Sequence, residues 1–203
     1  MAAEALLWIF DRSLEIIATL TGILYIIYSI ERNILLWPYG IISSAIYVYV
    51  CLIAGIYADM GLYAYYVLIG FYGWYHWLHG NKKSGDKNEL PIRKTSLKLW
   101  VGLFFATLVI YVIILYVLKN HTNSNVPYWD AFTTAVSITA TWMLTQKILE
   151  HWILWIAVDS VTVGLYFYKE LYPSIILYLI YTILAVAGYI QWDKEWKVQL
   201  TKH

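Results

Sequence analysis

The chain consists mainly of long apolar stretches separated by short polar clusters. A bilayer core is crossed by a helix of about 20 predominantly apolar residues, and seven stretches are suitable. Their approximate bounds are 14–30, 34–54, 60–77, 99–118, 131–148, 152–168 and 171–192. The pattern therefore predicts seven transmembrane helices. The only long polar connection, at residues 79–98, separates the first three predicted helices from the helix at 99–118 and the last three.

The composition excludes a soluble protein. Hydrophobic residues make up 61% of the chain, charged residues make up 13%, and the mean hydropathy is +0.60. Soluble domains are about 45–50% apolar and about 25% charged. A net charge of +1 leaves no cationic excess for nucleic acid. The single cysteine, Cys51, forms no disulfide within the chain.

The distribution of cations predicts the orientation in the membrane. Arg12, Lys119 and Lys169 fall on one side, and the other eleven of the 14 Lys and Arg residues fall on the opposite side. We therefore expect a multi-pass protein of a bacterial inner membrane with its N-terminus outside and its C-terminus in the cytoplasm. No cleavable signal peptide is expected, because the first span is too long for one. The basic connection fits a solvated cytoplasmic loop, with binding to anionic lipid as the alternative.

The sequence also contains an internal repeat, which is common in transporters. The motif at 33–37 (Asn-Ile-Leu-Leu-Trp) resembles that at 151–155 (His-Trp-Ile-Leu-Trp), and the motif at 73–77 resembles that at 188–192. A constant offset of 115 residues pairs further positions, namely Tyr57 with Tyr172, Leu62 with Leu177, Tyr63 with Tyr178, and Tyr66 with Tyr181.

The expected fold is an all-α integral membrane protein with seven helices in a 3+1+3 parallel repeat. Its parts are a first bundle at 14–77, a cytoplasmic linker and connecting helix at 78–118, a second bundle at 131–192 and a cytoplasmic tail at 193–203. Parallel repeats are related by an axis along the membrane normal, so a substrate site is expected between the halves.

Asp159 is the most informative polar residue because it lies inside the sixth span. A carboxylate at the bilayer centre costs at least about 2.5–3.5 kcal/mol, so such a group usually faces a cavity and meets a cation or a donor. Trp155 and Thr162 share its helix face. This stripe suits a planar, cationic, hydroxylated ligand. The alternative is a protonated carboxyl group that holds neighbouring helices together.

Other candidate binding residues are polar or aromatic groups within the spans. They are Trp37, Gly40, Ser44, Tyr63, Tyr66, Trp142, Gln146 and Tyr178. Gly40 would allow a ring to approach the backbone, and Gln146 offers both a donor and an acceptor. Packing within the helix bundles is the alternative for the tyrosines. The fifth span also carries a stripe of hydroxyl residues, Thr134, Ser137, Thr141 and Thr145, for which close helix contact is the alternative to ligand contact.

Several function classes lack their signatures. No P-loop occurs, which excludes a motor of that kind, and the last span has no lysine to hold retinal. We expect no catalytic residue, no metal site and no cofactor, because no nucleophile is tied to a recognisable base.

Four motifs together resemble the PnuC family of bacterial vitamin transporters. They are Trp-Pro-Tyr-Gly at 37–40, Gly-Trp-Tyr-His-Trp at 73–77, Tyr-Trp-Asp at 128–130 and Glu-His-Trp-Ile-Leu-Trp at 150–155. The resemblance covers essentially all seven spans. It implies a SWEET-like fold, a homotrimer, and facilitated diffusion of nicotinamide riboside followed by trapping through cytoplasmic phosphorylation by another enzyme. It also implies a midplane site that includes Trp37, Trp142, Gln146, Trp155 and position 159.

This chain departs from the family motifs at two places. It has His151 and Asp159 where the riboside carriers have asparagine, and it has serine at position 43 or 44 where some members have asparagine. A carboxylate suits a pyridinium ring and equally a thiazolium ring. Thiamine, carried by a similar branch of the family, therefore remains the alternative substrate. A non-transporting membrane subunit and an intramembrane enzyme are the alternatives from other classes.

Overall fold

The computed structural model describes residues 2–55, 57–80, 90–122, 124–168 and 172–201. The predicted start of the seventh span at Leu171, the connection at 81–89 and the last two residues of the predicted tail lie outside the described residues. The chain is divided into two compact units, and each is described by itself. Unit 1 comprises residues 1–75 and unit 2 comprises residues 76–203.

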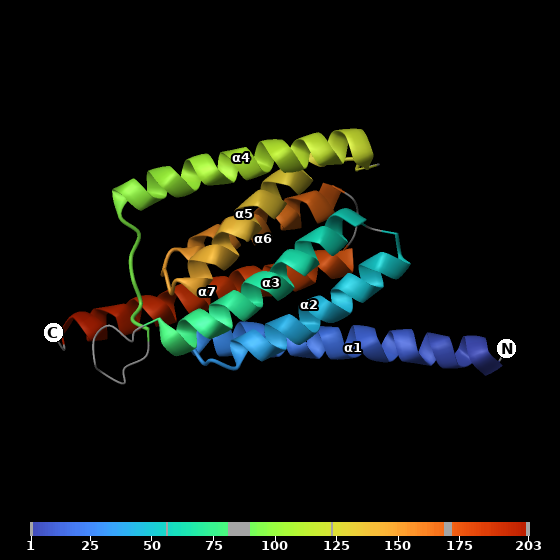
Figure 1. Cartoon of the computed structure of the whole chain (residues 1–203), viewed down its shortest axis with the longest axis horizontal. Helices are drawn as coiled ribbons and strands as arrows, with labels where there is room; N and C mark the ends of the chain where they lie inside the picture. Colours follow the sequence, from blue (N-terminus) through green and yellow to red (C-terminus); the bar gives the residue numbers. More distant parts are fainter. Residues whose placement is uncertain (1, 56, 81–89, 123, 169–171, 202–203) are drawn as a thin grey trace. The chain divides into compact units, whose positions relative to one another are not determined.

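The described residues form seven α-helices, coloured along the chain in Figure 1. Their bounds are α1 Ala2–Ile30, α2 Leu36–Ile53, α3 Tyr57–His79, α4 Leu97–His121, α5 Pro127–Thr145, α6 His151–Tyr168 and α7 Tyr172–Thr201. Each helix contains most of one predicted span, so the number and order of the helices were predicted correctly.

Three of the described helical segments are long and apolar enough to cross a membrane. These are Leu36–Ile53, Leu97–His121 and Ile175–Thr201, and Ile16–Ile30 is a shorter apolar segment. Of these three segments, the one in α4 contains the most apolar stretch, and only 11% of that stretch is buried inside the protein. Its exposed Phe104, Phe105 and Val109 side chains suit contact with acyl chains.

In unit 1, α1 and α2 pack closely because small or polar groups lie where the helices meet. The Ser43 hydroxyl donates to the Ala18 carbonyl at 2.9 Å. The ring of Tyr25 lies so close to Gly40 that an added Cβ would be 2.7 Å from its Cδ2 atom. The ring that approaches the Gly40 backbone is therefore supplied by the protein's own first helix.

In unit 2, helices α4 to α7 pack in sequence order. The Thr107 and Thr139 hydroxyls form a 2.7 Å hydrogen bond between α4 and α5. The last turn of α3 also belongs to unit 2, where the indole N–H of Trp77 donates to the carbonyls of Leu144 and Thr145. Those carbonyls lie at the end of α5, where a helix has no partners of its own for its last carbonyls.

One tryptophan packs against one glycine in each unit. Trp37 of α2 is 2% exposed, and its ring occupies the place where a Cβ of Gly73 in α3 would be. Trp152 of α6 is 4% exposed and lies against Gly188 of α7 in the same way. Both pairs obey the offset of 115 residues. Our pairing of the opening motifs, which matched Trp37 with Trp155, is therefore replaced by Trp37 with Trp152.

The same offset relates the helix boundaries and the loops before α2 and α6. Both ends of α2 map onto both ends of α6, and the end of α1 maps onto the end of α5. Arg32 and Lys147 are the corresponding loop residues, with φ values of 60° and 50°. The loops also share a backbone bond, from Asn33 N to Tyr28 O in one and from Ile148 N to Met143 O in the other.

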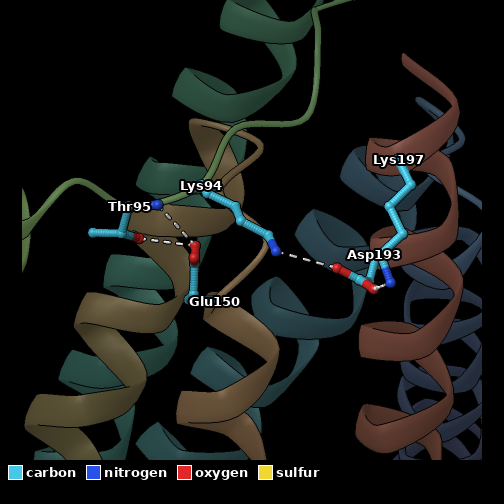
Figure 2. Close-up of polar contacts among 5 residues, drawn as sticks. All are labelled: Lys94, Thr95, Glu150, Asp193 and Lys197. Carbon is cyan, nitrogen blue, oxygen red and sulfur yellow. Dashed lines mark hydrogen bonds and ion pairs between the residues drawn. The ribbon is translucent and has the colours of Figure 1, made fainter. Parts of the chain in front are cut away.

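Residues 90–95, which we call the strap, lie across the α5–α6 loop and the end of α7. The Arg93 N–H donates to the Lys147 carbonyl, and the Leu149 N–H donates to the Arg93 carbonyl, each at 2.9 Å. Glu150 Oε2 accepts from the N–H and the hydroxyl of Thr95 at 3.0 and 2.9 Å (Figure 2). The strap therefore connects to the residue that directly precedes α6.

The strap reaches α7 through charged groups (Figure 2). Lys94 lies 3.3 Å from one carboxylate oxygen of Asp193, and Lys197 lies 2.6 Å from the other. Hydrogen bonding from Lys197 lowers the pKa of Asp193, which follows the predicted span. Because this pKa is lowered, the ion pairs of Asp193 contribute their full stability above the ordinary carboxyl pKa. That contribution is lost only as the pH falls through the lowered pKa of Asp193.

Gly188→Ala tests the close packing of α6 on α7. The new methyl group would lie 2.6 Å from Trp152 Cε2, so we expect overpacking to lower the free energy of unfolding by about 1–3 kcal/mol. Thermal unfolding of the purified protein in detergent measures the change. Gly164→Ala in α6 is the matched control, because nothing lies within 4 Å of an added Cβ there. Equal stability of Gly188→Ala and wild type would contradict the close approach.

Candidate functional site

Asp159 lies at the middle of α6 and is buried, as its depth in the sixth span predicted. Its side chain is 5% exposed. Thr162, on the same face, is 9% exposed, and its hydroxyl donates to the Val158 carbonyl in its own helix. The ring of Trp155, one turn before Asp159, is half-buried. The face combines an aromatic ring and a carboxylate, so it can recognise a planar cation.

The hydroxyl stripe of α5 is buried but bonded within its own helix. Ser137, Thr141 and Thr145 are at most 5% exposed. The Thr141 hydroxyl donates to the Ser137 carbonyl, and the Thr145 hydroxyl donates to the Trp142 carbonyl. These bonds favour the packing interpretation of the stripe over ligand contact. Trp142 itself is half-buried, so part of its ring is accessible.

Gln146 lies beyond the helix on which we expected it. The predicted span reached residue 148, whereas α5 ends at Thr145 and Gln146 is its C-cap. Its amide donates to the Thr145 hydroxyl at 3.2 Å. The positive φ of Lys147 turns the chain out of the helix, which is how an αL residue commonly ends one. The amide of Gln146 is therefore placed at a loop, next to Lys147.

In unit 1, Trp37 and Gly40 have partners within the protein, as the packing of Gly73 and Tyr25 shows. Ser44 is 9% exposed on α2. The offset of 115 residues places Ser44 at the position of Asp159 and Gly40 at the position of Trp155. Two pairs of predicted site residues thus occupy corresponding positions in the two units, although they were chosen for separate reasons.

The predicted tyrosines form equivalent aromatic pairs. Tyr63 and Tyr66 are 6.1 Å apart between ring centroids, and Tyr178 and Tyr181 are 5.7 Å apart, with nearly perpendicular rings in both. Each pair gains a different third ring. Tyr47 stacks on Tyr63 at 4.9 Å, and Tyr166 packs on Tyr178 at 5.3 Å. The aromatic pairs agree with the packing interpretation of the tyrosines.

The sequence analysis missed His151 as a buried residue. It is fully buried between Trp152 and Trp192, with ring centroids 4.6 and 4.8 Å away. Its Nδ1 atom lies 2.7 Å from the Ile148 carbonyl and is assigned as the donor, because a carbonyl only accepts. In the sequence His151 stands in a polar cluster between two spans, so it was interpreted as a residue at the membrane boundary. The repeat could have indicated its burial, because the equivalent residue in the first half is the apolar Leu36, which is also 0% exposed.

Lys147 was also missed as a buried group. It is 4% exposed, and its ammonium group lies 4.2 Å from the centre of a Trp77 ring. The positive φ of a lysine carries a backbone cost of about 1–3 kcal/mol, which surrounding contacts must offset. A cation–π contact of this kind contributes about 0.5–2 kcal/mol.

A hollow of about 320 Å³ on unit 1 is lined by Leu14, Ala45, Ile46 and Tyr49. None of these is a predicted site residue, and the lining is apolar. Within the part of the chain that the structure describes, no group of three His, Cys, Asp or Glu residues is placed to hold a metal ion.

The chain is similar to known vitamin transporters over most of its length. The sequence pattern of a family described as nicotinamide mononucleotide transporter matches residues 12–194. The chain is 27% identical to the nicotinamide riboside transporter PnuC of Neisseria mucosa, over 96% of this chain and 78% of that protein. It is 24% identical to the nicotinamide riboside transporter PnuC of Escherichia coli, over 88% and 84%.

Two further similarities concern a different substrate and the fold. The riboflavin/roseoflavin transporter RibM of Streptomyces davaonensis is 23% identical, over 91% of this chain and 87% of that protein. A crystal structure of the vitamin B3 transporter PnuC superposes with a TM-score of 0.72 at 27% identity, covering 97% of this chain and 88% of that one. The family resemblance drawn from the four motifs is thus confirmed.

Proposed function

Because this chain belongs to the nicotinamide mononucleotide transporter family, we propose that it takes up nicotinamide riboside by facilitated diffusion with alternating access. The observation that carries the proposal is the likeness, over 97% of the chain, to a solved vitamin B3 transporter. Two relatives named as nicotinamide riboside transporters match over most of their length. Phosphorylation by another enzyme in the cytoplasm would then retain the substrate.

Asp159 supplies the charge that the pyridinium ring of the riboside requires. A buried carboxylate is costly in a bilayer unless a cation or donors compensate it. Trp155 lies one helical turn away and offers an aromatic face, which attracts a cation through the ring quadrupole. In this proposal Trp155 and Trp142 stack against the heterocycle, and Asp159 neutralises its charge.

The other candidate residues contribute hydrogen bonds and shape. Ser44, Tyr63, Tyr66 and Tyr178 offer hydroxyl groups for the ribose, and Gln146 offers an amide near the loop end of α5. Trp37 and Gly40 act mainly through packing, because Gly73 and Tyr25 already fill their surroundings.

The charges of the spans favour the riboside over its mononucleotide. A phosphate monoester carries a charge of about −1.5 to −2 at neutral pH and is normally bound by Arg or Lys. Within the seven predicted spans the only such residue is Lys147, at the end of the fifth, whereas Asp159 lies at the centre of the sixth. A phosphate near Asp159 would therefore be repelled.

Thiamine is the second candidate, because its thiazolium ring is also a planar cation and Asp159 would serve it equally. A third, riboflavin, is suggested by the RibM relative. Its uncharged ring system gives Asp159 no charge to neutralise, which makes it a poorer fit. A membrane subunit without transport activity is the remaining alternative.

The finer architecture belongs to the same proposal. We infer a 3+1+3 arrangement with bundles at 14–77 and 131–192, a linker and helix at 78–118, and a tail at 193–203. The shared offset of the helix boundaries supports it. The excess of Lys and Arg on one side of the predicted spans supports a cytoplasmic C-terminus and an outer N-terminus in a bacterial inner membrane. The family motifs suggest a homotrimer.

Counterflow in proteoliposomes tests the function. We expect labelled nicotinamide riboside to accumulate in vesicles preloaded with the unlabelled compound, because exchange through one carrier needs no energy source. Nicotinamide mononucleotide, thiamine and riboflavin are tested as competitors, and only thiamine is expected to compete. A subunit without transport activity would give no counterflow, and preferential uptake of another vitamin would replace the assigned substrate.

Asp159→Asn tests the charge assignment. We expect the affinities for nicotinamide riboside and for thiamine to fall by about ten- to a hundredfold, because each cation loses its buried counter-charge. Isothermal titration of the purified protein measures both. Asp130→Asn in the first turn of α5 is the matched control. An unchanged affinity would instead favour the protonated, structural interpretation of Asp159.

A further inference from the structure

The two corresponding loops have the same backbone form but different surroundings. The loop at 31–35 precedes α2, and the loop at 146–150 precedes α6. Glu150 accepts two hydrogen bonds from Thr95 of the strap. Its counterpart in unit 1 is Leu35, whose side chain is 41% exposed and has no atom that can accept a hydrogen bond. The strap therefore restrains the second repeat by a contact that the first cannot make.

The strap forms two backbone hydrogen bonds with the loop that precedes α6. Arg93 donates to the carbonyl of Lys147 and accepts from the N–H of Leu149, which forms a short parallel bridge. Thr95 then binds the carboxylate of Glu150, the last residue before α6. Leu149 is also fully buried, so the loop is held by apolar packing as well as by hydrogen bonds.

The same strap is held to α7, the other main neighbour of α6. Lys94 pairs with Asp193 and also lies 3.9 Å from the ring centre of Trp196. The Ile92 N–H donates to the side-chain oxygen of Gln199 at 3.1 Å, and Ile92 is 5% exposed. The strap thus contacts both the loop that precedes α6 and the end of α7.

We propose that Thr95 and Glu150 are positioning residues for transport, because through the strap they fix the first turn of the helix that carries Trp155 and Asp159. This inference rests on the proposed function. A helix moves as a rigid rod, with a rise of about 1.5 Å per residue, so Asp159 lies about 13 Å along α6 from Glu150. A shift of the helix start is therefore passed on to the carboxylate. Ordering binding groups in advance lowers the cost of binding.

Hydrogen exchange tests the restraint without any ligand. In Thr95→Val the side chain keeps its shape but loses the hydroxyl donor to Glu150. Glu150→Leu installs the residue found at the equivalent place in unit 1. We expect both changes to speed exchange of the Leu149 amide by about fivefold, because a lost hydrogen bond loosens the loop. Thr95→Ser keeps both donors and should exchange as wild type does.

Transport kinetics test the positioning role. We expect Thr95→Val and Glu150→Leu to raise the KM for nicotinamide riboside by about fivefold, with little change in maximal rate per folded protein. Thr95→Ser should restore the wild-type KM. A merely structural role would reduce the amount of folded protein and leave KM unchanged. Thr133→Val is the matched control, because its hydroxyl donates to the Trp129 and Asp130 carbonyls in the first turns of α5, at the opposite end of that helix from the loop that the strap contacts.

The outcomes separate this inference from the function on which it rests. If wild-type protein shows no counterflow of nicotinamide riboside, the proposed function fails and the positioning role fails with it. If wild-type counterflow is normal and KM stays unchanged in Thr95→Val and Glu150→Leu, the positioning role alone is overturned. The positioning role is supported if the KM rises in Thr95→Val and in Glu150→Leu but stays at the wild-type value in Thr95→Ser.

Discussion

The packing of each unit depends on a tryptophan ring that lies directly on a glycine of the next helix. Any side chain at Gly73 or Gly188 would occupy the space of the indole, so the two helices approach only because that side chain is absent. In a bilayer the acyl chains are as apolar as the protein, and close van der Waals contact of this kind is a main source of helix association. Glycine at these two positions is therefore a requirement of the packing in each unit.

The helices were predictable because a bilayer imposes a simple requirement on length and hydropathy. Their ends were less so, since a polar residue ends an apolar stretch without ending the backbone hydrogen bonding. The helix α1 begins at Ala2 although Glu4, Asp11 and Arg12 precede the apolar stretch, and α7 continues past Trp192 to Thr201. The opposite error occurred at Gln146, where apolar periodicity continues but the backbone of Lys147 turns away.

A candidate site residue could be singled out where its chemistry conflicts with its surroundings. Asp159 was chosen for its depth in the sixth span, and the structure shows it to be buried, whereas its role in binding stays a prediction. Residues whose role depends on a distant partner could not be interpreted in this way. Nothing near Gly40 in the sequence indicates that Tyr25 covers it. His151 looked like a boundary residue, because its burial is created by Trp192, some forty positions further along the chain.

The shared loop turn has a consequence for how the protein is made. In both loops the turn is closed by backbone groups only five residues apart, such as Ile148 and Met143, and by a residue with positive φ. Such a turn needs no partner from later in the chain. The pairs α1–α2 and α5–α6 can therefore enter the bilayer as helical hairpins during synthesis, before the ribosome has produced the third helix of either group.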